Sequence, residues 1–247
     1  MNTIDELKYK QEALHHEIDN IAEANHLLNE LSPIYDGIGD IKAYLNAPLK
    51  IMWLLKESYD QDKSGNKGNG GWNIYDAFNT ETAWAYLTFQ RIAYTLYGFI
   101  NGQYYEDMPA IRNKREMVRL LNGIAYVNIN KMPGGTQSID GSMRTHYSVW
   151  KEIINKQIEA YNPDVIIFGG TKRFFDFEKP LTLHDTYYNQ DVNPMLASEI
   201  YKYKNRWLIS VYHPSYRMST EVYVDLIIDS LKEIQKQINI NCQNKNL

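Results

Sequence analysis

The sequence has a single cysteine and no long hydrophobic run. Cys242 is the one thiol in 247 residues, so no internal disulfide can form. A lone thiolate cannot hold a zinc ion or an iron–sulfur cluster. No stretch of about 18 apolar residues occurs, and the first residues lack the apolar segment of a signal peptide. We therefore expect a cytoplasmic protein with no metal, no cofactor and no membrane contact.

Positive charge is also scarce. The 26 Lys and Arg residues are outnumbered by 30 Asp and Glu residues, which gives a formal net charge of −4. A chain with this balance does not coat nucleic acid over its whole surface, so contact with phosphates requires a local basic patch. Tyrosine is abundant instead, and some of the 20 tyrosines must lie on the surface or line a cleft.

A long amphipathic helix is predicted at the N-terminus. Thr3 and Glu6 fit a capping box, and apolar residues recur at helical spacing as far as Leu31. We expect this helix to pack on the outside of the domain and to carry no chemistry, as part of a helical leader over residues 1–45. The adjacent His15 and His16 point in different directions, which favours a solvated helix face over a pair of ligands.

Four short apolar runs predict strands that are covered on both faces, and helical patterns lie between them. The runs span residues 49–56, 124–130, 164–170 and 207–213. Strand–helix alternation predicts an α/β fold, a three-layer α/β/α sandwich around a central, mainly parallel four-stranded sheet. One of the predicted helices covers residues 111–123. With no repeat and no linker, we expect a single domain over residues 1–247 that ends in a polar tail at 240–247.

Polar and glycine residues follow the carboxyl end of every predicted strand. These segments read KESYDQD, NINKMPGG, GGTKR and HPSYR, whereas the opposite strand ends resemble plain turns. In open α/β sheets, ligands bind beyond the carboxyl ends of the strands. Loops are commonly polar everywhere, but the asymmetry between the two edges favours a binding site at this one.

His213 lies directly after the fourth predicted strand and before Pro214. Proline pushes the residue that precedes it into an extended conformation, so the imidazole should project rigidly from the strand end. This arrangement suits a catalytic group, and it equally suits a residue that merely terminates a strand.

The other polar residues at these ends also have two interpretations. Lys56 and Glu57 could form a surface ion pair, or the Glu57 carboxylate could orient a water or stabilise a cation. Asn128 interrupts an apolar strand, so its amide either bonds neighbouring backbone or reads a ligand. Trp72 is either a core anchor or an aromatic platform for a base. Gly169 belongs to a glycine pair that lacks the third glycine of a dinucleotide fingerprint.

Taken in order, the strand ends resemble the motifs of the uracil-DNA glycosylase superfamily. VNINKMPGG is similar to the asparagine segment of its bacterial and archaeal branches, with Asn128 on the asparagine and Lys131 on the lysine. NPDVIIFGG resembles the strand before the last motif, and YHPSY matches the His-Pro-Ser motif closely. LLKES lies where the acidic first motif belongs, with Glu57 on its acid. The resemblance covers about residues 49–220 and leaves out the leader.

The resemblance implies an enzyme that flips a nucleotide out of DNA and hydrolyses the N-glycosidic bond of uracil or a related base. Asn128 would hydrogen-bond the base, and Trp72 and Gly169 would complete its binding site. His213 would donate a hydrogen bond to the departing base. Glu57 would stabilise the positive charge on the sugar or orient the attacking water.

The resemblance also implies a contact surface for DNA. Ser215, Arg217, Lys131 and Lys56 would bind phosphates, and Tyr216 with Arg217 stands where the family inserts a wedge into the duplex. A wider basic rim is conceivable, with acidic residues interspersed. It would comprise Lys56, Lys63, Lys67, Lys131, Arg144, Lys172, Arg173 and Arg217. The expected partner is uracil-containing DNA, single- or double-stranded, bound by a monomer.

Departures from the family pattern keep other functions open. The KES segment lacks the glycines of the first motif, and no aspartate stands at the usual water-activating position. The four cysteines of one branch are absent, which excludes its iron–sulfur cluster. The main rival is a non-catalytic protein of the same fold that binds a nucleotide or nucleic acid. A hydrolase of the esterase or phosphatase type that uses His213 and Glu57 is weaker, because no nucleophile elbow is visible.

Overall fold

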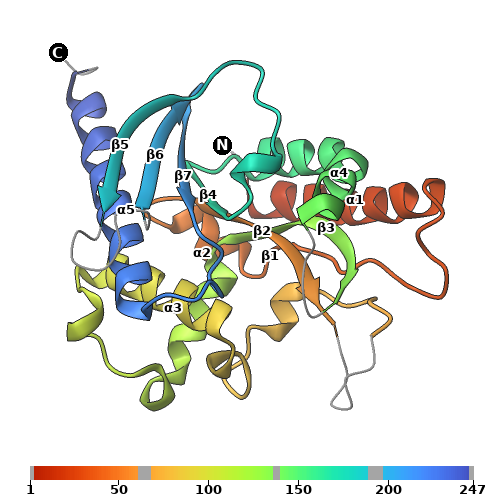
Figure 1. The fold of residues 1–247 in the computed structure, drawn as a ribbon, viewed down its shortest axis with the longest axis horizontal. Coiled ribbons are helices and arrows are strands. Elements are labelled where there is room, and N and C mark those ends of the chain that lie inside the picture. Colours follow the sequence, from red (N-terminus) through yellow and green to blue (C-terminus); the bar gives the residue numbers. More distant parts are fainter. Residues whose placement is uncertain (1–2, 61–67, 136–139, 189–196, 245–247) are drawn as a thin grey trace.

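The computed structural model describes residues 3–60, 68–135, 140–188 and 197–244 (Figure 1). Within these ranges the fold is α/β, but the expected four-stranded, mainly parallel sheet is wrong. The strands form one mixed sheet of seven, in the order β1-β3-β2-β4-β7-β6-β5. Lys63 and Lys67 of the expected basic rim lie outside the described residues.

The four predicted strands form the middle of this sheet. They are β2 (Ile51–Tyr59), β3 (Ala125–Gly134), β4 (Val165–Gly169) and β7 (Arg206–Val211). Their neighbouring pairs β3/β2, β2/β4 and β4/β7 are all parallel, with Trp53 of β2 opposite both Tyr126 of β3 and Ile167 of β4. Because the four strands run the same way, their carboxyl ends meet at one edge of the sheet.

Three further strands flank the parallel ones, and all of them pair antiparallel. The two-residue β1 (Gly37–Ile38) pairs with β3, while β6 (Ala197–Tyr203) and β5 (Thr182–Tyr188) extend the sheet beyond β7. In β6 only alternate residues such as Ser198 and Ile200 are buried, and β5 is largely exposed. A strand with one solvated face has no continuous apolar run, which is why the hydrophobic pattern missed β5 and β6. The two residues of β1 are both buried, but they are too few to form a recognisable run.

Helices cover both faces of the sheet (Figure 1). Successive side chains of β2 point to opposite faces: Met52 and Leu54 pack with the helices α1 (Ile4–Ala24), α2 (Ile41–Asn46) and α4 (Asp140–Tyr161). Trp53 and Leu55 pack on the other side with α3 (Leu87–Asn101) and α5 (Thr220–Asn244). Each core therefore lies between one face of β2 and its own helix layer.

The helices differ from the sequence prediction at their ends and over residues 111–123. Thr3 and Glu6 form the expected capping box, but α1 ends at Ala24 rather than near Leu31. The segment at 111–123 forms 3-10 turns instead of an α-helix. The 3-10 segments are η1 (Ile74–Ala77), η2 (Ala83–Ala85), η3 (Tyr105–Asp107), η4 (Ile111–Asn113), η5 (Arg115–Gly123) and η6 (Lys172–Phe174). Among the described residues, no helix has the length and apolar character needed to cross a membrane.

Candidate functional site

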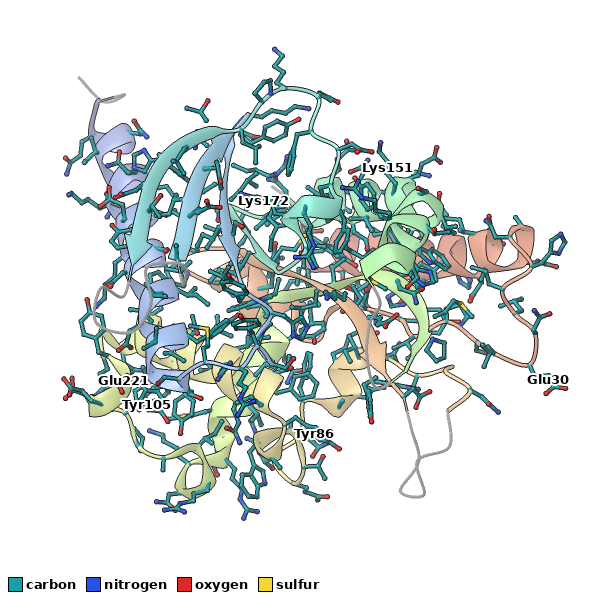
Figure 2. All side chains as sticks on the ribbon, in the orientation of Figure 1. Glu30, Tyr86, Tyr105, Lys151, Lys172 and Glu221 are labelled. Carbon is teal, nitrogen blue, oxygen red and sulfur yellow. The ribbon has the colours of Figure 1, made fainter. Side chains whose placement is uncertain are left out.

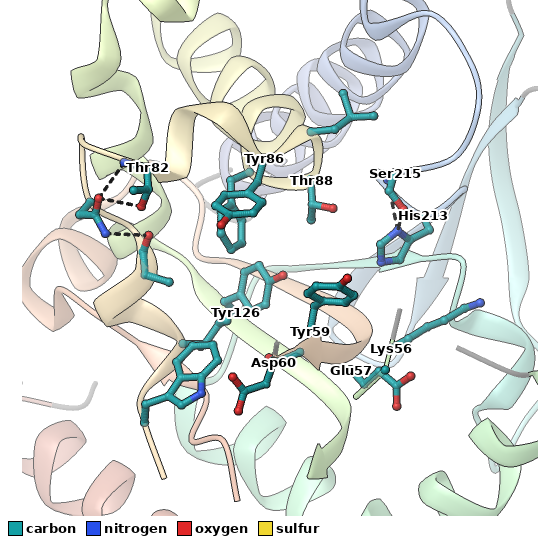
Figure 3. Close-up of a pocket in the computed structure, with 18 of the residues that line it drawn as sticks. Lys56, Glu57, Tyr59, Asp60, Thr82, Tyr86, Thr88, Tyr126, His213 and Ser215 are labelled. Atoms are coloured by element: carbon teal, nitrogen blue, oxygen red, sulfur yellow. Dashed lines mark hydrogen bonds between the residues drawn. The ribbon is translucent and has the colours of Figure 1, made fainter. Parts of the chain in front are cut away.

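A cavity of about 930 Å³ lies at the carboxyl edge of the parallel strands (Figure 3). Five of the predicted site residues line it together: Lys56 and Glu57 from β2, Trp72, and His213 and Ser215 after β7. These residues are up to 159 positions apart in the chain, counted from 56 to 215. The parallel strands bring them to one place, as the polar strand ends predicted.

His213 is held in one orientation by the residues that follow it. Its Nδ1 accepts the backbone N–H of Ser215 at 3.2 Å and lies 2.8 Å from the Ser215 hydroxyl. An amide N–H only donates, so Nδ1 carries no hydrogen and a neutral ring carries its hydrogen on Nε2. Burial, and then the nearby Lys56 ammonium, lower the pKa of His213 to about 4. At neutral pH the ring is therefore a neutral Nε2–H donor beside the cavity.

The two glycines at the end of β4 make room for the His213 segment. Gly170 has a φ of 71°, and a Cβ there would lie 3.2 Å from the backbone N of His213. A Cβ on Gly169 would lie 2.5 Å from Leu55 Cδ2 and 3.2 Å from Pro214 Cδ. Gly169 is not among the residues that line the cavity. Its described contacts are packing contacts, so the expected contact with a base is not observed.

Glu57 is held by an amide of fixed orientation. Asn130 Oδ1 accepts the indole N–H of Trp150 at 3.2 Å, and an indole nitrogen can only donate. The other end of the amide is therefore Nδ2, which donates to Glu57 Oε2 at 3.1 Å. Gly134 leaves room for the Glu57 side chain, since a Cβ on Gly134 would lie 2.6 Å from Glu57 Cγ. Asn130 of β3 and Trp150 of α4 together orient the Glu57 carboxylate. No local sequence motif predicted these contacts.

Asn128 does not line the cavity. Its side chain is 2% exposed, and Nδ2 donates to the hydroxyl of Ser58 at 2.7 Å. Ser58 itself lines the cavity, so the amide lies one residue behind the wall. Oδ1 of Asn128 is buried without a hydrogen-bond partner among the described residues. The expected direct reading of a base by Asn128 is therefore not supported in this arrangement.

Lys131 is buried in an ion pair and cannot contact DNA phosphates. Its ammonium lies 3.0 and 2.7 Å from the two carboxylate oxygens of Asp36 and 2.9 Å from Gln157 Oε1. Neither charged side chain is exposed. Asp36 Oδ2 also accepts the backbone N–H of Asn128 at 2.7 Å. The segment between α1 and β1 therefore supplies a carboxylate to the centre of the fold.

The expected basic rim is also reduced elsewhere. Lys172 pairs with Glu199 at 2.7 Å and lies away from the cavity-lining Tyr86 in Figure 2. Arg217 is exposed but is not among the lining residues. Of the described lining residues, Lys56 is the one Lys or Arg, and Glu57 and Asp60 carry the opposite charge.

Aromatic rings make up much of the cavity wall instead. Tyr59, Tyr86 and Tyr216 are exposed by 53%, 59% and 44%, and Tyr216 stacks on Tyr212 with ring centroids 4.2 Å apart. Figure 3 shows Tyr59, Tyr86 and Tyr126 turned toward the same space. The aromatic lining residues are Tyr59, Trp72, Tyr86, Phe89, Tyr126 and Tyr216. The sequence singled out Trp72 and Tyr216 individually, and for the other rings its one signal was the high tyrosine count.

For a flat aromatic ligand, the cavity provides stacking surfaces, the neutral Nε2–H donor of His213 and the oriented carboxylate of Glu57. Among the described residues, no three His, Cys, Asp or Glu side chains are grouped to hold a metal ion. No protein-family model matches this sequence, and no curated protein is significantly similar to it.

Proposed function

We propose that this chain is a hydrolase that releases uracil or a related base from DNA by cleaving the N-glycosidic bond. The observation that carries the proposal is the state of His213, a neutral ring with Nε2–H beside an aromatic cavity. Hydrogen-bond donors placed where charge develops are among the largest contributions to catalysis. A planar base with carbonyl oxygens is the ligand that this combination of rings and donor fits.

In the proposed reaction, the electron pair of the bond between base and sugar leaves with the base. His213 Nε2–H donates to the base oxygen on which this negative charge develops, and the Lys56 ammonium stabilises the same charge electrostatically. Lys56 lies close enough to His213 to lower the pKa of its ring, which supports this role.

The sugar becomes positively charged as the base departs. Glu57 faces this charge with a carboxylate that Asn130 holds in place. It either stabilises the cation or orients the water that adds to the anomeric carbon, and the water's proton passes to Glu57 or solvent. The base anion takes up a proton from solvent, so the products are the free base and an abasic sugar.

The direct test is incubation with single- and double-stranded oligonucleotides that contain one uracil, followed by cleavage at abasic sites. We expect abasic sites with the wild-type chain and few with His213→Ala. Oligonucleotides with thymine at the same position are the matched substrate control. Absence of abasic sites at every uracil, in either kind of strand, would contradict the proposal.

The second candidate is a non-catalytic protein that binds a nucleobase or nucleotide in the same cavity. Asn128 favours it, because this amide is committed to Ser58 and does not reach the cavity wall. Trp72 lines the cavity and provides a fluorescence signal for ligand entry. Quenching by free uracil or a nucleotide, without release of base from any oligonucleotide, is the result that this candidate predicts.

A further inference from the structure

The loop that carries His213 is held by a buried arginine from a distant helix. Arg91 lies on α3 and is only 2% exposed. Nη1 donates to the backbone oxygens of Pro214 at 2.7 Å and Tyr216 at 2.8 Å. Nη2 donates to the backbone oxygen of Met218, and Nε donates to Thr220 Oγ1 at 3.2 Å. One guanidinium thus binds four residues of the segment 214–220.

Burial of the Arg91 guanidinium is energetically unfavourable, which indicates that its hydrogen bonds to the loop have a function. Among the described residues, no carboxylate pairs with Arg91, and neutral oxygens take its hydrogen bonds. Burying a guanidinium without a counter-ion is unfavourable, and backbone carbonyls compensate for it only when their geometry is good. An apolar side chain would fill the same space between α3 and α5 without this cost. The fork of five N–H donors is what an apolar residue cannot supply.

The bonds of Arg91 and the orientation of His213 meet in the same few residues. Pro214 and Tyr216, which Arg91 binds, flank Ser215, whose backbone N–H is bonded to His213 Nδ1. The backbone N–H of Tyr216 also donates to the oxygen of His213 at 2.8 Å, which closes a tight turn. Fixing the carbonyls on both sides of Ser215 fixes the direction of its amide N–H.

We propose that Arg91 is the positioning residue for His213. Its guanidinium holds the turn at 213–216, so that the Ser215 amide reaches Nδ1 and the ring keeps its hydrogen on Nε2. The role of Arg91 in catalysis rests on the proposed function, but its effect on the imidazole does not. Arg91 acts through the loop and does not itself line the cavity.

The test measures the ring tautomer of His213 by long-range proton–nitrogen NMR at neutral pH. The chain has six histidines, and His213 is assigned by the signal that disappears in His213→Asn. In the wild type we expect an unprotonated Nδ1 and a protonated Nε2. In Arg91→Met the turn loses the hydrogen bonds from the guanidinium, and we expect nitrogen shifts that report a mixture of both tautomers. Arg91→Lys keeps the charge but not the fork, and should also give a mixture.

Thr220→Val is the matched control, because it removes the Nε partner and leaves both carbonyl bonds next to Ser215. It should keep the wild-type tautomer. A folded Arg91→Lys or Arg91→Met chain with a purely Nε2-protonated His213 would overturn the proposal, since Arg91 would then only stabilise the fold. Arg91→Lys carries the comparison if Arg91→Met does not fold.

A second readout uses uracil excision under single-turnover conditions. Arg91→Lys should lower the rate by about 10- to 100-fold, the scale of a small misplacement of a catalytic group, with DNA affinity within a few-fold. An unchanged rate with an altered tautomer would mean that the proposed catalytic function of His213 is wrong, although Arg91 does position its ring.

Discussion

At the scale of single residues, the proposed chemistry depends on a histidine that stays neutral. The unfolded ring has an ordinary pKa of about 6.5, whereas burial and Lys56 lower the pKa of folded His213 to about 4. Between these values the unfolded chain takes up a proton that the folded ring does not. The linkage relation then requires the free energy of unfolding to fall as the pH drops through this window.

This linkage can be measured on one substitution. In His213→Asn, the free energy of unfolding should fall less between pH 7 and pH 4.5 than in the wild type. Urea unfolding at several pH values measures the difference. His26→Asn is the control, since His26 is exposed with a φ of 54° that asparagine also tolerates. Parallel curves for wild type and His213→Asn would show that His213 titrates as in the unfolded chain.

A second prediction at this scale concerns Glu57. Glu57→Gln should lower single-turnover excision by roughly 100-fold or more, the scale of one general acid or base, because the amide cannot stabilise the sugar cation. Asp60→Asn is the control in the same cavity, where the side chain can still accept the N–H of Gly70. Equal losses in both variants would mean that only the total charge of the cavity matters.

At the scale of secondary-structure elements, the sequence predicted the four parallel strands and missed the three antiparallel strands that flank them. The four parallel strands have apolar residues on both faces, so composition alone identifies them. β5 and β6 are solvated on one side, and β1 has two residues, so their pairing depends on tertiary contacts. Arg91 could not be foreseen either, because a lone arginine in the apolar pattern of α3 gives no sign of the carbonyls it binds.

Side-chain pairs between residues far apart in the sequence were also not predicted. Lys131 was expected to bind phosphate because it matches the lysine of the family's asparagine segment. Its partner Asp36 lies 95 positions earlier, in a segment with no recognisable motif. Separation in the chain also hid the contacts of Asn130 with Glu57 and Trp150, which lie 73 and 20 positions away. Strand ends identify which side chains gather at an edge, but not which of them turn inward.

The buried pair gives a stability prediction for these elements. Lys131→Met leaves the Asp36 carboxylate buried without its cation, which should lower the free energy of unfolding by about 3–5 kcal/mol. Adding Asp36→Asn to Lys131→Met should recover part of this loss. Chemical denaturation of both single variants and the double variant measures the coupling. Strictly additive losses would contradict a direct ion pair.

At the scale of the whole molecule, the charge distribution limits how DNA can be held. The chain has a net charge of −4, and the described cavity lining has one lysine against two carboxylates. The cavity has more exposed aromatic rings than positive charges. Bases can stack on such rings, and the salt dependence of binding comes from neutralised phosphates rather than from stacking. Binding should therefore rely on bases more than on phosphates.

The salt dependence of binding tests this distribution. For a uracil-containing single strand, we expect the logarithm of affinity to fall with that of salt by no more than about two phosphate equivalents, at roughly 0.7 per phosphate. Fluorescence anisotropy over a range of NaCl concentrations measures the slope. Lys56→Ala should reduce the slope by about one phosphate equivalent. Tyr59→Ala should weaken binding and leave the slope unchanged. A slope of six or more equivalents would mean that a basic surface has been overlooked.

The most direct test of the central claim is the single-turnover rate of uracil excision by His213→Ala, measured with thermal stability on the same sample. A donor to the departing base acts mainly in the transition state. The account therefore predicts a fall of roughly 100- to 1,000-fold in rate, with DNA affinity within a few-fold of wild type. Full activity in a chain of lowered melting temperature would contradict it, since His213 would then only terminate a strand.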